Sequence, residues 1–258
     1  TVSVGGQPKY SKDYAPLPQG ITHVPFNDIA ALEAAISKNT CTVIIEPIQG
    51  ESGILPATQE YLQAARRLCD EHGALLILDE VQTGMGHTGK LFAYEHYGIT
   101  PDIISSAKAL GGGFPIGAIL TTDKIAPTFG PGTHGSTFGG NPMACAVGSR
   151  AFDIINAPET LAHVEKQGQK LQTALRELGE KTGAFKEVRG MGLLIGCVLA
   201  DQYKGRASEI TAAALKHGLM VLVAGADVVR FAPSLLLNDE DMAEGLKRLE
   251  AALTEWLV

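Results

Sequence analysis

The chain has 258 residues, 45% of them hydrophobic, and a formal net charge of −7. This length suffices for a sizeable core in one or two domains, and the acidic balance argues against a nucleic-acid partner. No run of about eighteen apolar residues is present, so no membrane span is predicted. Four separated cysteines predict reduced core thiols in a cytoplasmic protein, and the histidines lack the spacing of a metal site.

The first half of the chain predicts alternating helices and strands. Asn27 is expected to cap a short helix, and residues 42–47 form the first predicted strand. A helix is predicted over 58–72, followed by a strand over 74–79. Both strand segments are continuous apolar runs, so we expect them to be buried on both faces of a sheet. This alternation predicts an α/β fold with a right-handed, mostly parallel sheet.

The second half predicts a smaller α/β domain. A break near 156–158 divides the chain into a large domain, 1–154, and a small domain, 155–258. The remaining predicted elements are strands over 118–122, 188–199, 220–224 and 228–233, and helices over 142–156, 206–217 and 239–256. A further helix carries a core-facing stripe made of Leu161, Val164, Leu171, Leu175 and Leu178.

Three ionisable residues lie at the ends of predicted strands, namely Glu46, Asp79 and Lys108. Ligands of open parallel sheets bind outside the carboxyl ends of the strands, so these side chains are expected to meet in one crevice. A lysine that loses hydration there has a lowered pKa and becomes a nucleophile able to form a Schiff base. Taken singly, each carboxylate could instead cap a helix, and Lys108 could be a solvated residue before a glycine turn.

Five motifs in order carry a resemblance to a known family. They are Glu-Pro-Ile-Gln-Gly-Glu at 46–51, Leu-Asp-Glu-Val-Gln-Thr-Gly at 78–84, Ser-Ala-Lys-Ala-Leu-Gly-Gly-Gly at 106–113, Ser-Thr-Phe-Gly-Gly-Asn-Pro at 136–142 and Arg-Phe-Ala-Pro at 230–233. The chain resembles the class III, or ω-type, pyridoxal-phosphate-dependent aminotransferases of fold type I. Within this family it is most similar to the bacterial acetylornithine/succinyldiaminopimelate group. It corresponds to about the C-terminal two-thirds of the family, so it looks truncated at its N-terminus.

The resemblance implies four cofactor-binding residues. Lys108 would bond covalently to pyridoxal 5′-phosphate and carry the proton of the reaction, and Asp79 would keep the pyridine nitrogen protonated. Gln82 would donate to the phenolic oxygen of the cofactor; without the family it could equally be an exposed helix residue. Thr137 would reach the phosphate of a neighbouring subunit, which implies a homodimer, although such a hydroxyl could also serve a simple turn.

The resemblance also implies the substrates. Arg230 would bind a substrate carboxylate, and Glu51 would pair with Arg230 while an ω-amine reacts and release it for 2-oxoglutarate. The pair could alternatively be an exposed salt bridge. The expected reaction moves the δ-amino group of N2-acetylornithine, and possibly that of succinyldiaminopimelate, to 2-oxoglutarate in arginine biosynthesis. Alternatives are a succinylornithine, ornithine or 4-aminobutyrate aminotransferase, or a non-catalytic α/β module that lacks the upstream part.

One motif departs from the family pattern. The family has an arginine where this chain has His87, within Gly-Met-Gly-His-Thr-Gly at 84–89. A histidine is mostly uncharged at neutral pH, so the substitution removes a charge. We expect a change in the packing of this loop rather than in the chemistry.

Overall fold

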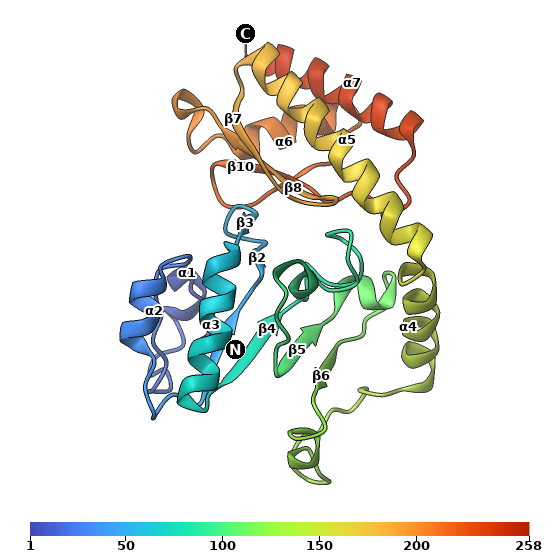
Figure 1. The fold of residues 1–258 in the computed structure, drawn as a ribbon. Coiled ribbons are helices and arrows are strands. Elements are labelled where there is room, and N and C mark those ends of the chain that lie inside the picture. Colours follow the sequence, from blue (N-terminus) through green and yellow to red (C-terminus); the bar gives the residue numbers. More distant parts are fainter. Residues whose placement is uncertain (258) are drawn as a thin grey trace.

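A computed structural model describes residues 1–257 and places their elements in two units, one above the other in Figure 1. The helices are α1 (Pro8–Ser11), α2 (Ile29–Ala35), α3 (Gln59–His72), α4 (Pro142–Ile155), α5 (Pro158–Thr182), α6 (Ala207–Lys216) and α7 (Asp239–Trp256). The strands are β1 (Thr42–Ile45), β2 (Ile48–Gln49), β3 (Leu55–Pro56), β4 (Leu75–Asp79), β5 (Ile103–Ser106), β6 (Ala118–Thr121), β7 (Phe185–Met191), β8 (Leu194–Leu199), β9 (Leu222–Val223) and β10 (Val228–Phe231). Short 3-10 turns cover Ala93–Tyr97, Lys108–Gly111, Ala126–Thr128 and Asp201–Tyr203.

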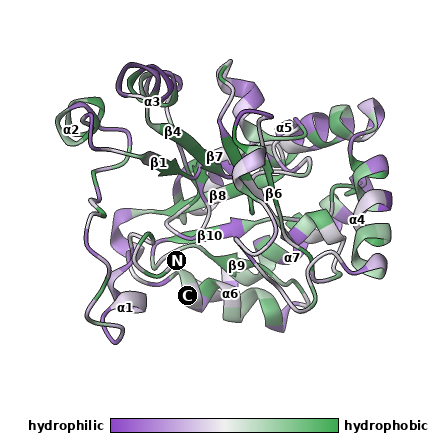
Figure 2. Cartoon of the chain, turned by 90° about the horizontal axis from the view of Figure 1, so that it is seen from below, coloured by the Kyte–Doolittle hydropathy of each residue, from purple (hydrophilic) through white to green (hydrophobic). Residues whose placement is uncertain are grey.

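The lower unit is built on a sheet with the strand order β1-β4-β5-β6. β1, β4 and β5 run parallel, and β6 is antiparallel to β5. The predicted α/β fold with a mostly parallel sheet is therefore confirmed. Helices α2 and α3 supply the core on one face, where Leu62, Leu76 and Leu78 are buried. β1, which belongs to the same core, is coloured as hydrophobic in Figure 2.

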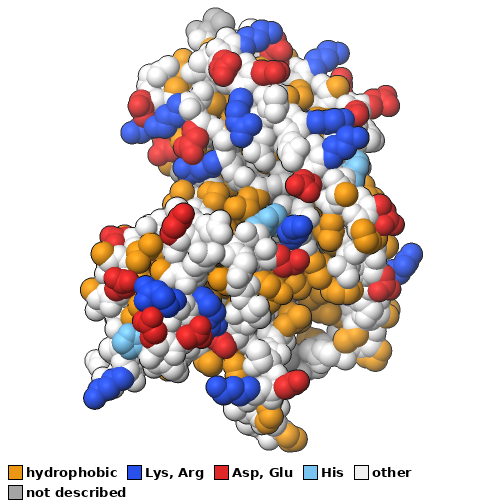
Figure 3. Space-filling model, in the orientation of Figure 1, with side chains coloured by type: hydrophobic (Ala, Val, Ile, Leu, Met, Phe, Trp, Pro, Cys, Tyr) orange, Lys and Arg blue, Asp and Glu red, His pale blue; other side chains and the backbone are white. Residues whose placement is uncertain are grey.

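The strands of this sheet are not buried on both faces, so that part of the prediction is wrong. Ile44 in β1 is 46% exposed, and Ile119 and Leu120 in β6 are 62% and 42% exposed. Only one face receives α2 and α3, and nothing in the described part of the chain covers these three side chains. Figure 3 accordingly shows a broad apolar area over the right side of the lower unit.

Local sequence explains where the helices begin and end, with one correction. The cap of α2 is Asp28, whose side chain accepts the amide N–H of Ala31 at 2.9 Å, and not Asn27 as predicted. Asn27 has a left-handed backbone (φ 65°) and instead accepts the amide N–H of Thr58 at 2.9 Å. Thr58 caps α3, and Gly73 ends it in the left-handed conformation, as the sequence predicts.

The upper unit is a sheet of order β7-β8-β10-β9 in which every neighbouring pair is antiparallel. Helices α5, α6 and α7 lie over it (Figure 1). The single strand predicted over 188–199 is wrong, because Gly192 adopts φ 54° and turns the chain between β7 and β8. The core-facing stripe of α5 is confirmed by the burial of its residues Val164, Leu171, Leu175 and Leu178. A domain boundary between 154 and 155 stays a prediction.

The two units meet along a line of close backbone contacts that we call the glycine seam, formed by Gly89, Gly168 and Gly192. A Cβ added to Gly168 would lie 2.7 Å from the Cα of Gly192, and one added to Gly192 would lie 2.9 Å from the Cα of Thr88. One added to Gly89 would lie 3.3 Å from the Cβ of Glu165. The absence of side chains therefore allows α5, the β7–β8 turn and loop 84–89 to touch directly.

All four cysteines are free, and Cys69 and Cys197 are buried as predicted. Cys41 and Cys145 are exposed, so the expectation of core thiols is wrong for these two. Their neighbours in sequence are apolar, but each lies on a surface that the described chain leaves open. Within residues 1–257, no helix combines the length and the hydropathy needed to cross a membrane.

Candidate active site

The three predicted strand ends meet at one edge of the lower sheet. Glu46 directly follows β1, Asp79 ends β4 beside β5, and Lys108 comes two residues after β5. Burial raises the pKa of Glu46, the amide N–H of Gly50 lowers it, and the nearby charges of Asp79 and Lys108 raise and lower it respectively. Glu46 Oε2 accepts that Gly50 N–H at 3.0 Å, which fits its predicted role as a carboxylate that ends the strand.

Lys108 is exposed, so the expectation that it loses its hydration is wrong for this chain. It opens the 3-10 turn Lys108–Gly111 with φ 48°, a left-handed conformation that few residues other than glycine adopt. Beside it lies an open hollow of about 450 Å³, lined by Lys108, His87 and the turn 112–116. Gly112 and Gly113 contribute no side chains to cover the lysine, which is why water reaches it.

Asp79 keeps one carboxylate oxygen for a partner. Its Oδ1 accepts the amide N–H of Val81 at 3.0 Å, whereas Oδ2 accepts no hydrogen bond within residues 1–257. The residue is paired in register with Ser105 of β5, which holds it at the sheet edge that leads to Lys108. A half-buried carboxylate with one free oxygen can stabilise a neighbouring cationic nitrogen.

The predicted pair of Glu51 and Arg230 is present, and Gln82 joins it. Arg230 Nη1 lies 2.6 Å from Glu51 Oε1, and the Arg230 side chain is 13% exposed against 54% for Glu51. Gln82 Nε2 donates to Glu51 Oε1 at 2.9 Å, and Arg230 Nη1 donates to Gln82 Oε1 at 3.2 Å. The hydrogen bond from Arg230 is the main reason why the pKa of Glu51 is lowered.

Thr137 is the one predicted site residue that the structure does not bring to the others. It is exposed in the loop before α4, and no hydrogen bond joins it to another predicted site residue in the described part of the chain. This placement does not test the expectation that Thr137 acts on a neighbouring subunit.

Two buried polar atoms near Lys108 lack hydrogen-bond partners within residues 1–257. They are Nδ1 of His87 and Oγ of Ser106, which lies two residues before the lysine. Burial lowers the pKa of His87 most, the Gly84 carbonyl raises it, and the charge of Lys108 lowers it further, so the imidazole is neutral. Unpartnered buried polar atoms are costly unless a ligand or water meets them. Ser106 was missed by sequence reasoning, and His87 was noticed only as a departure from the family motif.

These side chains fit pyridoxal phosphate. The cofactor presents an aldehyde, a ring nitrogen and a phenolic oxygen, for which the chain offers the amine of Lys108, the free oxygen of Asp79 and the amide of Gln82. The unpartnered atoms of His87 and Ser106 lie on the same side of the sheet edge, at the hollow or next to it in sequence. A polar, aldehyde-bearing ligand is what this set of groups can hold.

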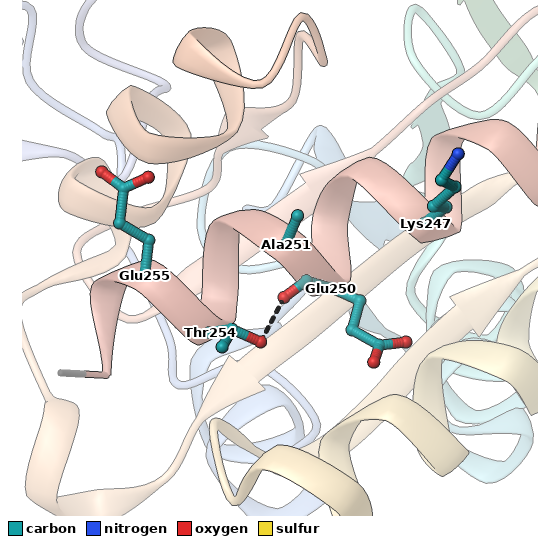
Figure 4. A pocket seen from close by; sticks show the side chains of 5 residues that line it. All are labelled: Lys247, Glu250, Ala251, Thr254 and Glu255. Carbon is teal, nitrogen blue, oxygen red and sulfur yellow. Dashed lines mark hydrogen bonds between the residues drawn. The ribbon is translucent and has the colours of Figure 1, made fainter.

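A larger hollow, of about 750 Å³, lies on the outer face of α7 (Figure 4). Its carboxylates are already paired, Glu250 with Lys181 at 2.5 Å and Glu255 with His217 at 2.9 Å. It is therefore a poor candidate for chemistry despite its size. Among residues 1–257, no three His, Cys, Asp or Glu side chains gather as metal ligands would.

Comparison with known sequences matches nearly the whole chain to one family. A sequence profile described as aminotransferase class-III matches residues 1–253. Acetylornithine aminotransferase of Neisseria meningitidis serogroup B is 84% identical over 256 residues, which are 99% of this chain and 64% of that protein. The succinylornithine transaminase/acetylornithine aminotransferase of Pseudomonas aeruginosa is 58% identical over 255 residues, covering 99% and 63%. The chain thus spans a little under two-thirds of the length of these relatives.

Solved structures agree with this match. N-acetylornithine aminotransferase from Stenotrophomonas maltophilia superposes with a TM-score of 0.85 at 45% identity, over 91% of this chain and 62% of that one. Ornithine aminotransferase from Toxoplasma gondii superposes with a TM-score of 0.92 at 31% identity, over 99% and 62%.

Proposed function

The chain belongs to the class-III aminotransferase family, and on this premise we propose that it carries the lysine-bearing part of an enzyme that transfers the δ-amino group of N2-acetylornithine to 2-oxoglutarate. The products are the semialdehyde and glutamate, as in arginine biosynthesis. The observation that carries the proposal is the 2.6 Å contact between Arg230 and Glu51, close to the Lys108 strand end. Its placement provides one carboxylate-binding group that can be opened or closed for two different substrates.

Enzymes of this class use pyridoxal phosphate, which supplies an aldehyde that bonds to amines and a ring that withdraws electrons. Lys108 would hold it covalently, and Lys108 Nζ would take the proton from the substrate carbon that bears the amine. Asp79 would face the ring nitrogen with its free oxygen and favour the protonated form of that nitrogen. Gln82 would donate to the ring oxygen, and Thr137 would bind the phosphate of a second subunit.

Arg230 would bind the carboxylate of 2-oxoglutarate through its guanidinium, whose flat geometry suits a carboxylate. Glu51 would occupy Arg230 while the δ-amine reacts, because that end of N2-acetylornithine has no carboxylate. The exposed Glu51 side chain can swing away, whereas Arg230 is largely buried. The two half-reactions then follow one another in a ping-pong order.

A homodimer and a cytoplasmic location complete the proposal. Phe138 and Met143, on either side of the loop that follows Thr137, are 80% and 65% exposed. Large apolar side chains gathered around a residue expected to serve the neighbouring subunit favour a subunit interface there. The free cysteines favour a reducing compartment.

The proposal is tested on the purified protein with Lys108→Ala, using Lys247→Ala as a matched control because Lys247 is 80% exposed on α7. We expect glutamate formation from N2-acetylornithine and 2-oxoglutarate to fall by at least about 100-fold in Lys108→Ala only. Borohydride reduction and peptide mapping should find the cofactor on Lys108. Equal activity of both variants would contradict the proposal, and higher kcat/KM with N2-succinylornithine or ornithine would reassign the substrate. A protein that binds no cofactor would be a non-catalytic module.

A further inference from the structure

Glu51, Gln82 and Arg230 form a closed ring of hydrogen bonds, which we call the 51–82–230 latch. Glu51 Oε1 accepts from both Arg230 Nη1 (2.6 Å) and Gln82 Nε2 (2.9 Å), and Gln82 Oε1 accepts from Arg230 Nη1 (3.2 Å). The three residues come from the loop after β2, the loop after β4 and strand β10. Gln82 therefore contacts both members of the ion pair.

The orientation of the Gln82 amide follows from its two neighbours. A carboxylate only accepts and a guanidinium only donates, so the NH2 group must face Glu51 and the carbonyl must face Arg230. The reverse orientation would oppose two acceptors on one side and two donors on the other. The neutral amide thus stabilises both charges, and the second N–H of Nε2 remains free for another acceptor.

The surroundings are shaped to hold this amide. A Cβ added to Gly50 would lie 2.5 Å from Cδ and 2.8 Å from Nε2 of Gln82, so the amide rests directly on the Gly50 backbone. The Gly50 carbonyl also accepts from Arg230 Nη1 at 3.3 Å, and the Gly50 N–H is held by Glu46 at 3.0 Å. Gln82 and Arg230 are hence fixed against backbone, and the exposed Glu51 is the member that can move.

We propose that Gln82 is a specificity-determining residue that holds the latch closed, so that a dicarboxylate must displace Glu51 from two partners rather than one. This inference rests on the proposed role of Arg230 as the anchor of a substrate carboxylate. The amine-donating substrate leaves the latch closed and does not meet this cost. Gln82 therefore weakens the binding of 2-oxoglutarate relative to that of the amino donor.

The inference is tested by titrating the cofactor-free protein with glutarate, a dicarboxylate without a reacting group, in an isothermal calorimeter. Gln82→Met keeps the length of the side chain and removes both hydrogen bonds. We expect it to tighten glutarate binding by three- to tenfold, which is about 1 kcal/mol. In a Glu51→Ala background the same substitution should tighten it by less than twofold, since the latch is already open.

Equal tightening in both backgrounds, or none in the wild-type background, would overturn the inference. Gln82→Glu is the second variant, which retains the shape of the side chain and adds a negative charge at Arg230, and it should weaken glutarate binding. Unfolding midpoints of all variants serve as the control for folding. If no variant binds glutarate, both the anchor role of Arg230 and the inference are refuted.

Kinetics distinguish this failure from failure of the proposed function. In the cofactor-loaded enzyme, Gln82→Met should lower the KM for 2-oxoglutarate relative to the KM for N2-acetylornithine. Normal transamination with an unchanged KM ratio would refute the inference alone. Absence of transamination, together with glutarate binding that responds to Gln82 as described, would refute the proposed function alone.

Discussion

Two glycines inside helices should respond in opposite directions to the same substitution. Gly168 in α5 belongs to the glycine seam, and a methyl group there would lie 2.7 Å from the Cα of Gly192. Ordinary contacts begin at 3.4 Å, so backbone would have to move by 3.4 − 2.7 = 0.7 Å or more. Gly245 in α7 has no atom closer than Leu219 Cδ1 at 3.9 Å, which is open space for a methyl group.

The magnitudes follow from two competing effects. Replacing glycine by alanine within a helix stabilises it by about 0.5–1 kcal/mol, because the unfolded chain loses freedom. Overpacking of a tight contact costs about 1–3 kcal/mol. Gly245→Ala should therefore raise the free energy of unfolding by about 0.5–1 kcal/mol. Gly168→Ala should lower it by about 1–2 kcal/mol, the difference between the two effects.

Urea unfolding followed by tryptophan fluorescence measures both variants. The chain has one tryptophan, Trp256, whose ring centroid lies 4.8 Å from that of Tyr203 in the upper unit. Its emission should report the loss of this packing. An unchanged slope of free energy against urea would indicate that only stability differs. If Gly168→Ala were as stable as Gly245→Ala, the close contact of α5 with the β7–β8 turn would be refuted.

Two further predictions concern buried polar groups. Arg189 donates from Nε at 3.0 Å and from Nη2 at 2.8 Å to the carbonyl of Gly53, next to the Glu51 loop. Arg189→Ala should destabilise the protein by about 1–3 kcal/mol and Arg189→Lys by less, in urea unfolding, because lysine retains a donor; equal losses would contradict this account. Burial raises the pKa of Glu80 from 4.5, although its carboxylate accepts from Thr83, Ala93 and Tyr94. A raised folded pKa means that its stabilisation is complete below pH 4.5 and is lost as the pH rises through the folded value. The unfolding free energy of the wild type relative to Glu80→Gln should thus fall with rising pH, and a difference that is constant with pH would argue against it.

The sequence was a good guide to positions along strands. Apolar runs that end in Glu46 and Asp79 predicted the carboxyl edge of the sheet, and the structure places both residues there with Lys108. It could not reveal which sheet face is covered, because Ile44 has the same apolar character whether or not something packs on it. The exposure of Lys108 was missed for the same reason, since desolvation depends on neighbours that are distant in sequence.

The contacts of the site were harder to predict than its members. Glu51 and Arg230 were paired through the family resemblance, but nothing local indicates that Gln82 lies between them, because Arg230 is 148 residues further along the chain. The glycine at position 50 was read as part of a turn, whereas its importance lies in the amide that rests on it. Close approach of this kind depends on three-dimensional packing rather than on sequence periodicity.

The glycine seam has a consequence for how substrates of different shape are accommodated. Direct backbone contact leaves no flexible side chains that could slide or rearrange between the two units, so rotation of one unit against the other would break packing across the whole line. Rigid-body closure around each substrate is thereby disfavoured. Adaptation then falls to single side chains at the rim, and a swing of Glu51 is a smaller and faster motion than a hinge.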